Sequence, residues 1–134
     1  MAARNLHELA QSTVDAIVAS PSVGIYNVGI TMSPDRRRRQ YALYSTPRPW
    51  NHMVFLAYDL TAKQAVALEK HLFTYCAKGE ATTARQQKYS RVKEVEYRSS
   101  VGGLVDGGLK NYSVYVAWCE PGRKRKLRQV EEAM

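Results

Sequence analysis

The feature that most restricts the fold is an apolar run followed at once by a helical pattern. Residues 53–60 (MVFLAYDL) are almost continuously apolar, which predicts a central strand covered on both faces. Thr61 and Gln64 then form a capping box that opens a helix over residues 61–76. A strand that leads into a capped helix indicates an α/β protein. The inward side of this helix is formed by Ala65, Leu68, Leu72 and Tyr75.

Further strands and helices are predicted on both sides of this unit. Asn5 and Glu8 form a second capping box, which predicts a helix over residues 6–19. Two segments, 23–31 (VGIYNVGIT) and 113–118 (SVYVAW), are rich in β-branched and aromatic residues and predict strands. A shorter alternation predicts a strand at 92–97, and the polar residues 80–90 predict a loop.

These elements predict an α/β domain over residues 1–122, with a small three- to four-stranded sheet flanked by helices. Residues 123–134 form a basic C-terminal tail in this interpretation. The two cysteines, Cys76 and Cys119, are expected to be reduced and partly buried, although a disulfide between them is geometrically possible.

The charge of the chain points to its partner. Twenty lysines and arginines stand against twelve acidic residues among 134, a formal net charge of +8. Such an excess favours a polyanion, above all nucleic acid. The longest apolar runs have the length of strands, and no secretory signal opens the chain, so we expect an intracellular protein of the cytoplasm or nucleus with no membrane partner.

Basic residues gather in two segments. Four consecutive arginines, residues 36–39, follow a helix start at Ser33-Pro34-Asp35. They cover every face of one helical turn, so at least one must point inward or along the sheet, which is costly unless it meets an anion. The alternative is a solvated charge run. The predicted nucleic-acid contacts are Arg36, Arg38, Arg39, Tyr44, Trp50, Arg123, Lys124, Arg125 and Lys126, with the two aromatic residues stacking on unpaired bases.

The order of strand, arginine-bearing helix, strand and glutamate-bearing helix over residues 23–75 resembles the core of the GIY-YIG nuclease family. In this comparison Gly29 matches the family glycine, and Arg37 matches the catalytic arginine eight positions further on. Glu69, in the sequence Ala67-Leu68-Glu69, matches the metal-binding glutamate. Tyr41 falls where many members have a histidine.

The chain departs from the family at its tyrosines. Asn27 stands where the tyrosine of Tyr-Ile-Gly is expected, and Tyr26 is one residue away, so it would point to the opposite face of a regular strand. The second family tyrosine belongs on a preceding strand, where this chain has a predicted helix. Either residues 23–31 compress two family strands into one, with Tyr26 replacing one tyrosine, or the hydroxyl chemistry is lost.

The resemblance implies a Mg²⁺-assisted cleavage of a phosphodiester bond. Arg37 would stabilise the charge that develops on phosphorus, and Glu69 with water molecules would hold Mg²⁺ or another divalent cation. Tyr26 or Tyr41 would assist proton transfer, which requires a pKa well below about 10. The alternative for Glu69 is a surface residue paired with Lys63 or Lys70.

We therefore expect a nucleic-acid-binding protein that resembles a GIY-YIG endonuclease, with DNA favoured over RNA. One small active site would have to nick twice, or work as a homodimer, to break a duplex. Two alternatives belong to other classes. The first is a catalytically silent nucleic-acid-binding module, and the second is a basic domain that docks on, or inhibits, an acidic protein.

Overall fold

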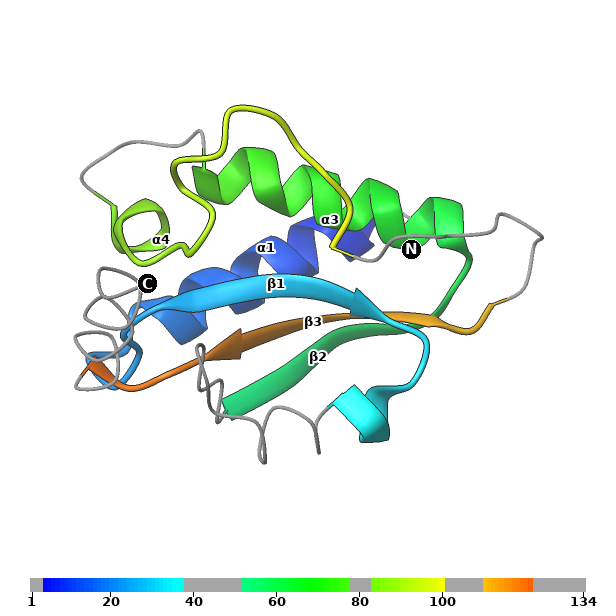
Figure 1. The fold of residues 1–134 in the computed structure, drawn as a ribbon, viewed down its shortest axis with the longest axis horizontal. Helices are drawn as coiled ribbons and strands as arrows, with labels where there is room; N and C mark the ends of the chain where they lie inside the picture. The colour runs from blue at the N-terminus through cyan, green and yellow to red at the C-terminus, as the bar shows by residue number, and fades with distance from the viewer. Residues whose placement is uncertain (1–3, 38–51, 78–82, 101–109, 122–134) are drawn as a thin grey trace, which may run out of the picture.

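The computed structural model describes residues 4–37, 52–77, 83–100 and 110–121 (Figure 1). The chain forms an α/β structure, as predicted, with a helical turn at residues 34–37 after the first strand. Among the described residues no helix has both the length and the apolar character needed to cross a membrane. The elements, in chain order, are α1 (Arg4–Val18), β1 (Tyr26–Thr31), β2 (His52–Leu60), α3 (Ala62–Ala77), α4 (Ala84–Gln87) and β3 (Tyr112–Trp118).

The three strands form one sheet in the order β1-β3-β2, and β3 is antiparallel to both neighbours. The prediction that residues 53–60 form the central strand is therefore wrong, because β2 lies at an edge. Residues 112–117 of β3 are all buried, whereas most of β2 is half-buried or exposed. An apolar run predicts that both faces of a strand are buried, but it does not predict whether the strand has a neighbour on one side or on both.

The two faces of the sheet pack against different parts of the chain. Val114 and Val116 of β3 and Val28 of β1 share one buried cluster with residues of α1 and α3, the helices that cover this face (Figure 1). Tyr115 and Ala117, which alternate with these valines, belong to a second cluster that Met53 and Phe55 of β2 join. We call these the helix-covered face and the opposite face.

Strands β1 and β2 run in the same direction on either side of β3. Both strands are antiparallel to β3, so they are parallel to each other, and such a pair requires a crossover. The described part of this connection is the helical turn at residues 34–37. In Figure 1 the strands lie between this turn and α3, so the turn stands away from the helix layer.

Helix α3 begins as the sequence predicts. The backbone N–H of Thr61 donates to Gln64 Oε1 at 2.9 Å, and the N–H of Gln64 donates to Thr61 Oγ1 at 3.1 Å. These two bonds are the predicted capping box. Three of the four residues predicted to face inward, Ala65, Leu68 and Leu72, are fully buried, while Tyr75 is only half-buried.

Three smaller predictions are wrong. Residues 84–87, predicted as loop, form the one-turn helix α4, whose N-cap Thr83 accepts a hydrogen bond from Gln86 N. Residues 92–97 form turns and bends instead of a strand. In the described part of the chain, the strand-like pairing of β1 on this side is a single bridge from Tyr26 to Tyr89, which precedes these residues. Helix α1 begins at Arg4, so Asn5 lies inside the helix and is not its N-cap.

Candidate functional site

Many of the predicted site residues lie outside the residues that the structure describes, and their roles stay predictions. Four predicted residues are described: Tyr26, Arg36, Arg37 and Glu69. Those outside the described ranges are Arg38, Arg39, Tyr41, Tyr44, Trp50, Arg123, Lys124, Arg125 and Lys126.

Tyr26 lies in the core, with 0% of its surface exposed. Its hydroxyl donates to the backbone carbonyl of Arg85 in α4, and its ring lies 5.3 Å from that of Tyr89. Burial raises the pKa of Tyr26 far above its ordinary value, so the hydroxyl keeps its proton. Here Tyr26 ties α4 to β1, and it lacks the lowered pKa that proton transfer would require.

Glu69 is also enclosed, with 1% of its surface exposed, so it is not the surface residue that the alternative interpretation expected. Its Oε1 accepts a 2.5 Å hydrogen bond from the hydroxyl of Tyr97 and a 3.0 Å bond from Ser100 N–H. Its Oε2 is buried without a hydrogen-bond partner. The Oγ of Ser100 in turn accepts from the N–H of Ile30 at 2.9 Å, so Glu69 fastens residues 97–100 to the edge of β1.

The surroundings of Glu69 do not by themselves form a magnesium site. Mg²⁺ takes six oxygen ligands at 2.0–2.1 Å and usually keeps several waters, whereas Glu69 offers one unpartnered buried oxygen, since its other oxygen already accepts two hydrogen bonds. In the described ranges, no three acidic, histidine or cysteine side chains gather as a metal site would need. The predicted role of Glu69 as a metal ligand stays a prediction.

Arg36 and Arg37 lie on the helical turn that follows β1. Arg36 is exposed and Arg37 is half-buried, and the N–H of Arg37 donates to Ser33 O at 2.9 Å. The strands separate this turn from α3, which carries Glu69 (Figure 1). The structure therefore does not bring the predicted arginine and the predicted carboxylate together.

The structure reveals a tyrosine that the sequence analysis missed. Tyr115 of β3 pairs directly with Gly29 of β1, on the opposite face. A Cβ atom added to Gly29 would lie 2.5 Å from Tyr115 Cζ and closer still to its hydroxyl, so the ring covers the glycine. The resemblance places the second family tyrosine on a strand that precedes this glycine, whereas β3 follows β1 in the chain, so Tyr115 does not match that position. The sequence signal for Tyr115 is the tyrosine in the predicted strand SVYVAW.

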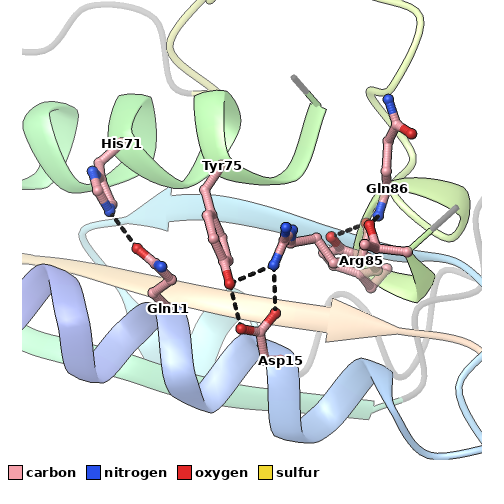
Figure 2. A network of polar contacts seen from close by, with 8 residues as sticks. Gln11, Asp15, His71, Tyr75, Arg85 and Gln86 are labelled. Carbon is pink, nitrogen blue, oxygen red and sulfur yellow. Dashed lines mark hydrogen bonds and ion pairs between the residues drawn. The ribbon is translucent and has the colours of Figure 1, made fainter. Parts of the chain in front are cut away.

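A second polar cluster joins α1, α3 and α4 (Figure 2). The hydroxyl of Tyr75 donates to Asp15, and Arg85 Nη1 lies 2.5 Å from the same hydroxyl and 3.4 Å from Asp15 Oδ1. The Arg85 guanidinium also stacks over the Tyr75 ring at 3.9 Å. Burial and the bond to Asp15 raise the pKa of Tyr75. This cluster holds three helices together, which is a structural task.

Comparisons of the chain with protein-family models, with curated proteins and with solved structures find no match. The resemblance to the GIY-YIG family therefore stays a prediction from the sequence.

Proposed function

We propose that the protein binds nucleic acid, and that the contact surface lies on the opposite face of the sheet, around the start of the arginine run. The observation that carries this proposal is the position of the helical turn at residues 34–37, which bears Arg36 and Arg37 and lies on the far side of the strands from α3 (Figure 1). The net charge of +8 supports a polyanionic partner.

Three basic residues near the helices already have partners within the fold, so they are weaker candidates for phosphate contacts. Lys88 Nζ donates to the carbonyls of Val18 at 2.8 Å and Ser20 at 3.1 Å, so this cation caps the C-terminal end of α1. Arg85 and Arg91 bind Asp15 and Glu94. These three cations already have partners within the fold, whereas Arg36 is exposed on its turn.

Affinity for DNA and RNA duplexes and single strands, measured between about 50 and 200 mM salt, tests the proposal. Phosphate contacts release counterions, so we expect log Kd against log salt to be steep, with a slope of about 0.7–0.9 for each phosphate neutralised. Following the sequence prediction, we expect DNA to bind more tightly than RNA. Affinity that does not change with salt would contradict nucleic-acid binding and favour docking on a protein.

One observation favours a second candidate, phosphodiester cleavage by a GIY-YIG-like chemistry. The hydroxyl of Tyr115 lies over Gly29, the residue that matches the family glycine, whereas the hydroxyl of Tyr26 donates to the carbonyl of Arg85, and both tyrosines are buried. Tyr115 is thus a better source of the required hydroxyl than Tyr26. Supercoiled plasmid incubated with Mg²⁺ or with EDTA tests cleavage. We expect Tyr115→Phe to abolish cutting, and Tyr26→Phe to retain it in the fraction that folds.

A further inference from the structure

A hollow of about 720 Å³ lies at one corner of the molecule, where the end of α1 meets the ends of β2 and β3. Its volume is in the range of small-molecule sites, which is about 300–1,000 Å³. None of the residues discussed above as a predicted site residue lines it. Its lining includes Ile17, Ser20, Val23, His52, Trp118 and Glu120.

Two stacked rings form one part of the lining. His52 at the start of β2 pairs across the sheet with Trp118 at the end of β3. Their ring centroids are 5.4 Å apart and the rings are tilted by only 17°, so the two half-buried rings stack on each other. Ile17 and Val23 add apolar side chains. The outer face of such a stacked pair can bind a further planar ring by stacking.

A carboxylate stands at the rim of the same surface. Glu120 Oε1 lies 3.2 Å from His52 Nε2, and the Glu120 side chain is 55% exposed. A carboxylate accepts hydrogen bonds and donates none, so it selects a ring that presents N–H groups. Its two oxygens match two adjacent donors in a bidentate pair. Ser20 adds a hydroxyl to the lining.

We propose that this hollow binds an unpaired nucleobase with two adjacent N–H donors, which among the common bases is guanine. The base would stack on Trp118 and His52, and its N1–H and N2–H would donate to Glu120. A guanidinium has the same donor pattern. The net charge of +8, however, repels a basic peptide and attracts a polyanion, which favours the base. The inference rests on the proposed function and adds a second contact, beside the end of α1, that prefers single-stranded, guanine-containing nucleic acid.

The test uses the full chain and three nine-nucleotide probes: oligothymidine, the same strand with one central guanine, and the same strand with inosine in its place. Inosine lacks the N2 amino group. We expect the guanine probe to bind about 5- to 20-fold more tightly than oligothymidine, with inosine between them, because one bidentate pair discriminates at this level. Glu120→Gln removes the preference. Glu96→Gln is the matched control, since Glu96 is also exposed and the charge change is the same.

Free guanosine separates this inference from the proposed function. In a Trp50→Phe background, we expect guanosine to quench the fluorescence of Trp118, and Glu120→Gln to weaken this binding. Quenching by guanosine without affinity for any oligonucleotide would support guanine binding in the hollow, and it would overturn the proposed function. Equal affinity for all three probes, with no effect of Glu120→Gln or Trp118→Leu, would overturn the inference that the hollow binds guanine. Salt-dependent binding of nucleic acid, the proposed function, would be unaffected by that result. Stronger quenching by an arginine amide than by guanosine would assign the site to a guanidinium and also overturn the inference.

Discussion

On the helix-covered face of the sheet, the polar groups that resemble a catalytic set serve the fold. Tyr26 holds α4, and Glu69 holds residues 97–100 against β1. On the opposite face, Tyr115, which no motif singled out, lies over Gly29. The difference shows that a residue's type and spacing in the chain do not fix its role, because the side of the sheet on which it falls decides what it can reach.

The largest effect is expected for Glu69→Ala. This change removes a side chain that is only 1% exposed and leaves the hydroxyl of half-buried Tyr97 and the N–H of Ser100 without their acceptor, and a donor left unpaired costs about 1–3 kcal/mol where water cannot reach it. We expect the free energy of unfolding in urea to fall by about 3 kcal/mol. As the control, Lys70→Ala removes an exposed charge from the same helix and should change stability by less than about 0.5 kcal/mol. Equal stability of the two variants would show that Glu69 has no structural task.

The next effect concerns alkaline pH. Burial raises the pKa of the Cys76 thiol from 9.0 to about 11, and burial also raises the pKa of Tyr26 and Tyr89. The folded state therefore holds protons that the unfolded chain releases, so stability is complete below about pH 9 and is lost as pH rises towards 11. Cys76 alone accounts for about 2–3 kcal/mol of this loss. Urea unfolding at a series of pH values measures this loss, and Cys76→Ala should reduce the fall in the free energy of unfolding between pH 9 and 11. The same fall in the variant would mean that a group other than Cys76 causes it.

On the opposite face, Gly29→Ala tests the contact with Tyr115. The new methyl group would overlap the tyrosine ring, which is only 2% exposed and so has little space to move. We expect a loss of about 2 kcal/mol in the free energy of unfolding, within the range for overpacked cores. In a Tyr115→Leu background the same change should cost less than about 0.5 kcal/mol, since the overlapping ring is gone. Additive losses in the double variant would mean that the two residues do not meet.

The smallest effect is expected at the edge of the sheet, away from both faces. Asp59 is the one non-glycine residue in the described ranges with a positive φ, 55°, and it lies where bulges interrupt the pairing of β2 with β3. Asp59→Gly should raise the free energy of unfolding by about 0.5 kcal/mol, and Asp59→Val should lower it by about 1–2 kcal/mol. Thermal unfolding of both variants measures the difference. A stabilising valine would contradict the left-handed conformation.

Local signals predicted local structure well. The structure confirms the capping box of Thr61 and Gln64 and the strand SVYVAW. Both depend only on residues that are close together in the chain, through short-range hydrogen bonds and side-chain alternation. The start of α4 was missed although Thr83 and Gln86 have the same Thr-x-x-Gln spacing as that capping box. A four-residue helix has no room for an apolar stripe to confirm such a signal.

The site could not be predicted in the same way, since it depends on which strands are neighbours. No local pattern indicates that β3, the last strand, lies between β1 and β2, so the contact of Tyr115 with Gly29 could not be predicted. The burial of Glu69 was equally hidden. On the helix wheel it lies beside the stripe of Leu68, and only the packing of residues 97–100 over it decides that the carboxylate is enclosed.

The central claim is that nucleic acid meets the side of the sheet that bears the arginine run, and a matched pair of double variants tests it most directly. Arg36→Gln with Arg37→Gln removes two charges from the turn after β1, and Lys63→Gln with Lys70→Gln removes two exposed charges from α3. Affinity for DNA is measured against salt after circular dichroism confirms that both variants fold. The account predicts that the arginine pair lowers the salt slope by about 1.4–1.8 and that the lysine pair leaves it unchanged. The reverse result would contradict the account and move the contact surface to the helices.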